Sequence, residues 1–186
     1  MLRAYGPNCD GSIIDAAKGQ RIPDDATWID LEEPTREEDK LVEECVRVQV
    51  PTREDMSEIE PSSRLYERNG TLYMTLGALY GVEDGHPRSD PIGFVLTDNR
   101  VVTVRYVTPK PIRSFQNHAR TDKALVKDAL TATYGLLDSI IDRLADCGAD
   151  AKPALPALKK LKFSPDDRIR ECATAAVTKI ERAAAP

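Results

Sequence analysis

The stretch from Pro51 to Leu76, PTREDMSEIEPSSRLYERNGTLYMTL, constrains the fold more than any other part of the chain. Thr52 can cap a short helix, and Asp55 stands three residues later as its capping-box partner. Pro61 stops that helix, because proline lacks the N–H group that a helix interior needs. Asn69-Gly70 then favours a type I′ turn between two strands. A capped helix that leads directly into a hairpin predicts helices packed on a β-sheet.

Short strands and tight turns recur along the first 107 residues. In the strand around Trp28, alternation places Trp28 and Asp30 on one face and Ile29 and Leu31 on the other. The last strand alternates Val102 and Val104 with polar residues, which predicts a half-buried strand. Residues 83–91, rich in Gly, Pro and Asp, are expected to form a loop. The expected strands are residues 2–5, 12–14, 28–31, 64–68, 71–80, 92–97 and 101–107.

Helix signals flank these strands. Thr35, with Glu38 three residues later, predicts a capped helix directly after the strand at 28–31. Pro111 lies near the start of a helix whose Ile112, Phe115 and Ala119 face the core. Asp122 is expected to cap a long helix that reaches about residue 147. Strands followed by helices indicate an α/β (α+β) fold, a mixed sheet built from hairpins and covered by helices.

The composition changes after Cys147. Gly148 ends the long helix, and residues 149–184 are rich in Ala, Lys and Pro and predict two helices around a turn at 163–165. The segments PALPALKKL and SPDDRIRECATAAVTKI resemble one HEAT-type repeat, with Asp167 and Arg170 at the positions that tie such repeats together. One repeat cannot bury its own apolar face and needs a neighbour. We therefore expect two units, residues 1–147 and residues 149–186.

The charge distribution is uneven. The net charge is −5, but residues 24–67 hold 15 acidic and 5 basic residues. Residues 152–186 hold 8 basic and 4 acidic residues. The acidic block argues against a nucleic-acid partner and permits cations. The alternative is that these carboxylates only form solvated helix faces.

Other functional classes find little support in the sequence. The four cysteines are scattered and only His86 and His118 are present, so a Cys/His zinc site is not expected and free thiols suggest a reducing cytosol. No apolar run approaches the roughly 18 residues of a membrane span, and the N-terminus does not resemble a signal peptide. Ser62-Ser63 fits a turn, and no Gly-rich loop cradles phosphate, so we do not expect an enzyme.

Several motifs in order resemble the cytosolic domain of the CorA/ZntB family of divalent-cation transporters. The resemblance covers about residues 26–145. It rests on Trp28-Ile29-Asp30-Leu31 with Pro34-Thr35, on the acidic helix at 50–60, on the hairpin at 64–73, on Phe94-Val95-Leu96-Thr97 with its partner strand, and on residues 136–142, which resemble the start of the family's stalk helix.

The resemblance implies an α/β/α domain of which five copies form a funnel below a membrane pore. It thus implies a cytoplasmic location at the inner membrane and a homo-oligomer, a pentamer in the family. The family's Gly-Met-Asn filter tripeptide is not in this sequence. We therefore expect that this chain does not conduct ions by itself.

Asp55 is the one metal-ligand candidate. Some family members hold a divalent cation between subunits, and Asp55 matches the carboxylate from the short acidic helix. The second carboxylate would come from the stalk of the next subunit, beyond Cys147. Mg²⁺ prefers oxygen ligands and keeps several waters, so one or two carboxylates suffice. The alternative is that Asp55 only completes the cap with Thr52.

Two functions remain open from the sequence. The first is a soluble regulatory domain of a CorA-like magnesium or divalent-cation transporter that senses divalent cations. The second is a protein-interaction or assembly module, a natural or engineered fusion in which a partner docks on the helical tail. The apolar residues that would receive this partner are Leu155, Leu158, Ile169 and Val177.

Overall fold

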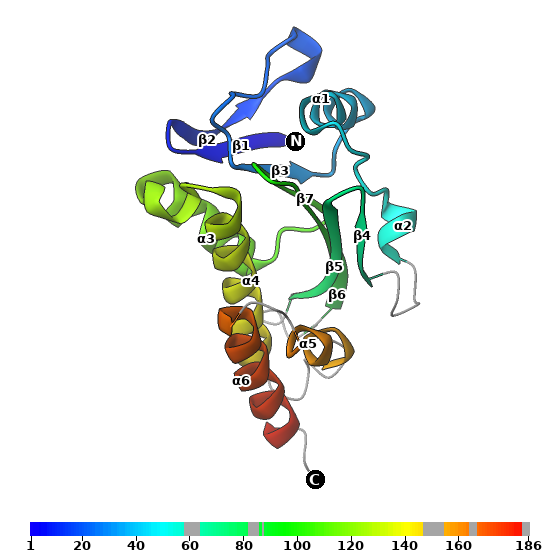
Figure 1. Cartoon of the computed structure of the whole chain (residues 1–186), viewed down its shortest axis with the longest axis vertical. Coiled ribbons are helices and arrows are strands. Elements are labelled where there is room, and N and C mark those ends of the chain that lie inside the picture. Colours follow the sequence, from blue (N-terminus) through cyan, green and yellow to red (C-terminus); the bar gives the residue numbers. More distant parts are fainter. Residues whose placement is uncertain (58–63, 82–85, 87, 147–154, 164–166, 184–186) are drawn as a thin grey trace.

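A single mixed sheet of seven strands forms the centre of the computed structural model (Figure 1). The structure describes residues 1–57, 64–81, 86, 88–146, 155–163 and 167–183. The strand order is β2-β1-β3-β7-β6-β5-β4, and every neighbouring pair is antiparallel except β3 and β7. The strands are β1 (Leu2–Gly6), β2 (Cys9–Ile14), β3 (Trp28–Glu32), β4 (Leu65–Arg68), β5 (Thr71–Tyr80), β6 (Arg88–Leu96) and β7 (Val101–Arg105). The predicted α+β class with a mixed sheet is confirmed.

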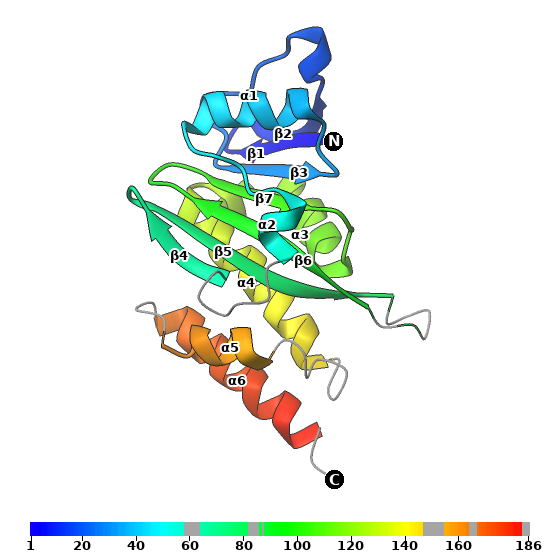
Figure 2. The ribbon, with the colours of Figure 1, turned by 90° about the vertical axis from the view of Figure 1, so that its right-hand side faces the viewer.

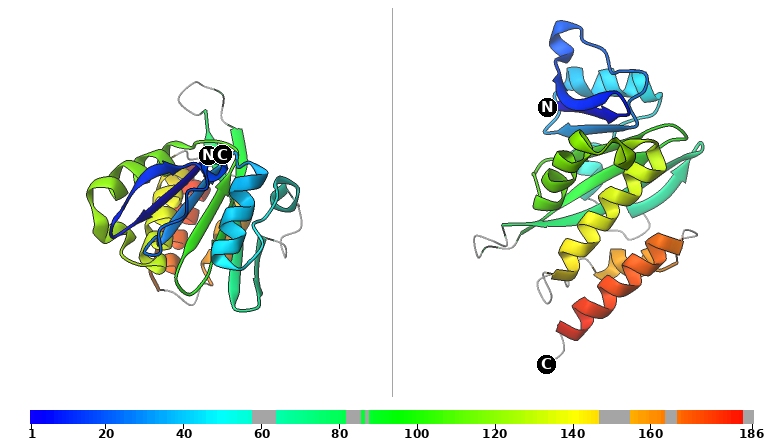
Figure 3. Two further views of the ribbon diagram at one scale, coloured as in Figure 1. Left: turned by 90° about the horizontal axis from the view of Figure 1, so that it is seen from above. Right: turned by 90° about the vertical axis from the view of Figure 1, so that its left-hand side faces the viewer.

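Helices cover both faces of the sheet. In Figure 2, α1 (Arg36–Val46) and α2 (Arg53–Ser57) lie in front of the strands, while α3 (Lys110–Thr121) and α4 (Ala129–Asp146) lie behind them. The opposite view in Figure 3 brings α3 and α4 to the front. The short 3-10 helices η1 (Ala16–Lys18) and η3 (Lys123–Val126) lie in two of the described connections. The domain therefore has three layers, with helices on either side of the sheet.

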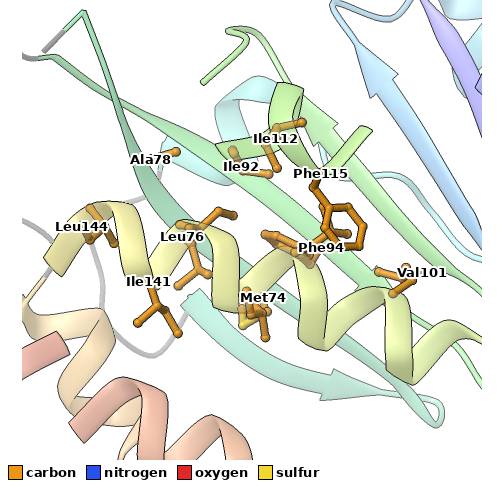
Figure 4. Packing of buried hydrophobic residues seen from close by; sticks show 14 of the residues in the cluster. Met74, Leu76, Ala78, Ile92, Phe94, Val101, Ile112, Phe115, Ile141 and Leu144 are labelled. Carbon is orange, nitrogen blue, oxygen red and sulfur yellow. The ribbon is translucent and has the colours of Figure 1, made fainter. Parts of the chain in front are cut away.

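Each face of the sheet has its own hydrophobic core. Ile29 and Leu31 face the core under α1, whereas Trp28 faces the core under α3 and α4, as the alternation predicts. Trp28 stacks on Tyr5, with ring centroids 4.3 Å apart, and meets Phe115 edge-on at 5.3 Å. Figure 4 shows the larger core, where side chains of β5, β6 and α4 interdigitate.

The hairpin between β4 and β5 turns where the sequence predicts. Asn69 and Gly70 have φ angles of 54° and 76°, the two positive values that a type I′ turn requires. Both turn residues are exposed, and so is every residue of β4. The strand therefore forms an open edge of the sheet.

Two strand predictions were wrong in detail. β7 is buried on both faces rather than half-buried, because β3 and β6 flank it and helices cover both of its sides. β6 begins at Arg88, within the residues expected to form a loop. Pro91 is tolerated there because β7 pairs with β6 only from Ile92 onward, so the missing N–H of Pro91 does not interrupt a ladder with β7.

The helix after the sheet also differs from its prediction. Asp122 caps only the short helix η3, through a bond from Ala124 N to its Oδ1. The long helix α4 begins later, at Ala129, where Asp128 Oδ1 accepts a bond from Thr131 N at 2.7 Å. The predicted start of α3 and its buried Ile112 and Phe115 are confirmed.

The tail forms α5 (Leu155–Leu161) and α6 (Asp167–Ala183), and α6 runs along α4 (Figure 1). Ala173, Val177 and Ile180 of α6 belong to the same hydrophobic cluster as α4 and the sheet. Asp167 pairs with Arg170 within α6. Both the HEAT-type likeness and the division into residues 1–147 and 149–186 stay predictions, and residues 164 and 165 of the expected turn lie outside the described part.

Among the described residues, no helix combines the length and apolarity needed to cross a lipid bilayer.

Candidate functional site

The central strands hold a fully buried ion pair between Asp30 and Arg105. Asp30 Oδ2 accepts bonds from Arg105 Nη2 and from Gln116 Nε2, both at 2.8 Å. Asp30 Oδ1 accepts bonds from Arg105 Nε at 3.1 Å and from Thr103 Oγ1 at 2.7 Å. Trp28 Nε1 donates to Thr103 Oγ1 at 2.9 Å. Because donors of the fold occupy both carboxylate oxygens, Asp30 ties β3, β7 and α3 together and is not a ligand site.

The outer end of Arg105 meets a second carboxylate. Its Nη1 donates to Val107 O at 2.8 Å and to Thr108 Oγ1 at 3.0 Å, and it lies 3.0 Å from Glu32 Oε1. Burial alone would lower the pKa of Arg105, but Asp30 and Glu32 raise it above its ordinary value. Burial would raise the pKa of Glu32, but bonds from Arg105 and Thr108 outweigh burial and lower it. Arg105 is therefore held as a cation between two carboxylates.

The acidic helices α1 and α2 lie on the other face of the sheet. The predicted capping box of α1 is confirmed: Glu38 N donates to Thr35 Oγ1 at 3.3 Å, and Thr35 N donates to Glu38 Oε2 at 2.9 Å. Acidic residues fill the first turn of each helix, where the positive end of the helix dipole stabilises them. Much of the acidic block therefore has a structural role.

Asp55, the predicted metal ligand, makes the predicted cap on α2. Its Oδ2 accepts bonds from Thr52 N at 2.9 Å and Thr52 Oγ1 at 2.8 Å, and Thr52 Oγ1 accepts one from Asp55 N at 3.2 Å. Asp55 is exposed, and its Oδ1 has no hydrogen-bond partner among the described residues. One carboxylate oxygen caps the helix while the other stays open to solvent. Metal binding by Asp55 stays a prediction.

Sequence reasoning missed a second acidic feature on α1. Asp39 Oδ1 is buried and has no hydrogen-bond partner among the described residues. Burial raises the pKa of Asp39, and the neighbouring carboxylates Glu43 and Glu38 raise it further. The i, i+4 spacing of Asp39 and Glu43 was a signal that could have shown this repulsion. The carboxylates of α1 therefore repel one another, and the N-terminal ammonium of Met1, 2.9 Å from Glu38 Oε2, offsets part of this repulsion.

A third group of contacts fixes α2 on the sheet. Arg53 lies 3.6 Å from Asp90 Oδ2 of β6 and 5.0 Å over the ring of Tyr106. Burial raises the pKa of Tyr106, and the charges of Asp39 and Glu54 raise it further. Asp90 has a buried Oδ1 without a hydrogen-bond partner in the described part of the chain. The end of the sheet under α2 is therefore a negatively charged region with Arg53 at its edge.

A family model described as CorA-like Mg²⁺ transporter protein matches residues 23–168, well over half of the chain. The chain belongs to this CorA-like family. The match begins before β3 and ends in the first turn of α6, so it extends past residue 147, where the sequence predicts a change of unit.

Curated relatives carry the same family name. The magnesium transport protein CorA of Haemophilus influenzae is 25% identical over 146 residues, which are 78% of this chain and 46% of the relative. The protein of that name from Escherichia coli K12 is 26% identical over 121 residues, 65% of this chain and 38% of the relative. This CorA-like chain therefore spans less than half the length of these relatives.

Solved structures share the fold. The soluble domain of CorA from Methanocaldococcus jannaschii superposes with a TM-score of 0.65 at 14% identity, covering 99% of this chain and 91% of that domain. The cytoplasmic domain of ZntB from Vibrio parahaemolyticus superposes with a TM-score of 0.55 at 14% identity, covering 84% and 81%. The fold expected from the CorA/ZntB resemblance is thus confirmed.

The remaining residues considered from the sequence do not converge on a site of this CorA-like domain. His86 and His118 are both exposed, and Ser62-Ser63 lies outside the described residues. Burial, with a bond to Asp25, raises the pKa of Cys9 to about 12, which leaves that thiol unreactive. Within the described ranges, no three His, Cys, Asp or Glu side chains group as a metal site would require.

Proposed function

We propose that this chain is the soluble regulatory domain of a CorA-like magnesium or divalent-cation transporter, not an enzyme, and that it does not conduct ions by itself. The observation that carries the proposal is the family match over residues 23–168. The likeness to the soluble domain of an archaeal CorA over 99% of this chain supports it. Such a domain would lie on the cytoplasmic side of the membrane and work as a homo-oligomer, a pentamer as in the family.

Regulation would come from divalent cations bound on the face of the sheet that α1 and α2 cover, called here the acidic face. Oδ1 of Asp55 is open to solvent, and the adjoining helix α1 carries carboxylates that repel one another. A hydrated Mg²⁺ needs only one or two carboxylates, and a carboxylate from a second subunit would complete the site. A cation bound between subunits favours one subunit packing over another, which is the differential affinity that allosteric control requires.

Thermal unfolding in millimolar MgCl₂, against NaCl of equal ionic strength, tests the sensing role. Bound Mg²⁺ should stabilise the chain by about 1.4 kcal/mol at ten times its dissociation constant. Asp55→Asn should remove this increment, because the amide keeps a cap acceptor but carries no charge.

Thr52→Ala is the matched control, because it weakens the same cap and keeps the carboxylate. We expect a loss of about 1 kcal/mol in stability with the Mg²⁺ increment retained. An equal stabilisation by Mg²⁺ in the parent chain and in Asp55→Asn would show that Asp55 does not bind the cation. If Mg²⁺ does not stabilise the parent chain, the proposed sensing role is wrong.

The alternative function, an assembly module, has weaker support. Two of the four apolar residues expected to receive a partner, Leu158 and Val177, are buried in the core that α5 and α6 share with α4. Leu155 is partly buried against the same core, and the side chain of Ile169 lies outside the description. The apolar face of the tail finds its neighbour within its own chain, which favours the transporter-domain proposal.

A further inference from the structure

A hollow of about 710 Å³ opens where the far end of the β5–β6 hairpin meets α3 and α4. Leu79 and Tyr80 of β5 contribute its apolar part, and the first half of α3 forms one wall. At this end β6 pairs only with β5, because β7 joins it from Ile92 onward. Figure 3 shows this hairpin end extending beyond the rest of the sheet. The volume is within the range of small-molecule sites.

The hollow is strongly basic although the chain is acidic overall. Arg88, Lys110, Arg113 and Arg143 line it together with His86. No aspartate or glutamate is among the described residues of its lining. The net charge of the whole chain is −5, so this concentration of positive charge is local. A concave surface with one sign of charge attracts counter-ions of the opposite sign.

Two of these cations, Arg88 and Arg113, have no partner among the residues that the structure describes. The guanidinium groups of Arg88 and Arg113 are exposed and make no hydrogen bond or ion pair with any described residue. Two other arginines show the contrast: Arg105 is paired with carboxylates inside the sheet, and Arg100 donates to backbone carbonyls. A guanidinium presents its N–H groups in a planar fork that matches phosphate oxygens.

The start of α3 adds further donors to the same wall. The N-cap of this twelve-residue helix is Pro109, and no side chain caps it. The positive end of the helix dipole is therefore not neutralised by a cap, although Pro111 in the first turn has no N–H group to donate. Ser114 and Asn117 on the next turn contribute a hydroxyl and an amide to the lining. Guanidinium, hydroxyl and amide donors, near the positive end of a helix dipole, together form a set suited to phosphate.

From these observations we infer that the hollow binds an anion that carries two or more phosphate groups. The two exposed guanidinium groups of Arg88 and Arg113 can each bind a phosphate through paired N–H groups, so they suit a ligand with two or more phosphates better than a single phosphate. The phosphates belong either to a free polyphosphate, such as a nucleoside triphosphate, or to an anionic lipid headgroup. The site is distinct from the acidic face of α1 and α2 and does not depend on the proposed cation sensing.

Isothermal titration calorimetry of the full chain tests the site. Sodium tripolyphosphate and ATP are titrated in buffer with EDTA, so that divalent cations do not contribute, and vesicles with and without phosphatidylglycerol are tested by flotation. The variant Arg88→Gln/Arg113→Gln removes two positive charges and should raise the dissociation constant about tenfold or more. A tenfold increase corresponds to a loss of about 1.4 kcal/mol in binding free energy. Both side chains are exposed, so the variant should keep the parent's circular dichroism spectrum.

Arg21→Gln/Arg68→Gln is the matched control, because it removes two exposed arginines outside the hollow. Tripolyphosphate or ATP binding that is lost only in the hollow variant supports a free phosphate ligand. Flotation with phosphatidylglycerol vesicles alone, lost in the same variant, supports a lipid headgroup. Absence of both kinds of binding in the parent chain, or an equal loss in the control, would overturn the inference.

Discussion

At the scale of single residues, the buried pair of Asp30 and Arg105 is the most consequential interaction. Asp30 accepts four hydrogen bonds, and two of them come from Arg105. Arg105→Met would leave an uncompensated carboxylate in the core and should lower the free energy of unfolding by about 3–5 kcal/mol. Urea unfolding measures the loss. Adding Asp30→Asn should recover part of it, and a loss below about 1 kcal/mol in the single variant would contradict this account.

Replacing Asp39, in contrast to Arg105, is expected to stabilise the chain, and the gain should depend on pH. Its pKa is raised in the folded chain, first by burial and then by Glu43 and Glu38, above an ordinary value of 3.8. The folded chain therefore binds this proton more tightly than the unfolded chain, and the ionised carboxylate disfavours folding at neutral pH. Asp39→Asn should raise the unfolding temperature at pH 7, and the gain should vanish below the ordinary value of 3.8. Scanning calorimetry at pH 7 and at a pH below 3.8 measures the difference in unfolding temperature between Asp39→Asn and its parent. The same difference at both pH values would exclude ionisation of Asp39 as its cause.

The sequence could predict contacts between residues that are close along the chain, but not contacts between distant residues. The caps at Thr35 and Thr52 could be predicted because each partner stands three residues away. The pair of Asp30 and Arg105 could not, because 75 residues separate them and only the parallel register of β3 and β7 brings them together. Likewise, the basic hollow gathers residues from β6, α3 and α4 that have no shared pattern in the sequence.

At the scale of helices and strands, local signals predicted where most elements lie but not how deeply they are buried. The turn at Asn69-Gly70 and the start of α3 followed from their own residues. The burial of β7 on both faces did not, because it depends on the neighbours that β7 acquires in the sheet. A strand with Thr103 and Arg105 on one side is indistinguishable from a half-exposed strand until Asp30 is known to face them.

The contact between α3 and α4 provides a test at this scale. A Cβ atom added at Gly135 of α4 would lie 2.3 Å from Phe115 Cε2 of α3. Gly135→Ala would gain about 1 kcal/mol in helix propensity, yet it should still destabilise the chain by about 1–3 kcal/mol through overpacking. Phe115→Leu added to Gly135→Ala should relieve the clash. The double variant should therefore lose less stability than the sum of the losses in the two single variants. A Gly135→Ala variant more stable than its parent would show that α3 and α4 are not packed this closely.

At the scale of the whole molecule, the shared core predicts a single cooperative transition. Ile180 of α6 is fully buried in the cluster that contains Trp28, the only tryptophan. Ile180→Ala should therefore lower the urea midpoint reported by Trp28 fluorescence, with a loss of about 2–5 kcal/mol. Thr178→Ala, exposed on the same helix, is the control and should change stability by about 0.5 kcal/mol at most. An unchanged Trp28 transition in Ile180→Ala would indicate that residues 149–186 unfold as a separate unit.

The claim at the centre of this account is that divalent cations and the packing of subunits are linked in this domain. Sedimentation velocity with and without millimolar MgCl₂, at constant ionic strength, measures that linkage most directly. We predict a shift to a larger species when Mg²⁺ is added, and no such shift for Asp55→Asn. A sedimentation coefficient that is the same in both buffers for the parent chain would contradict the account.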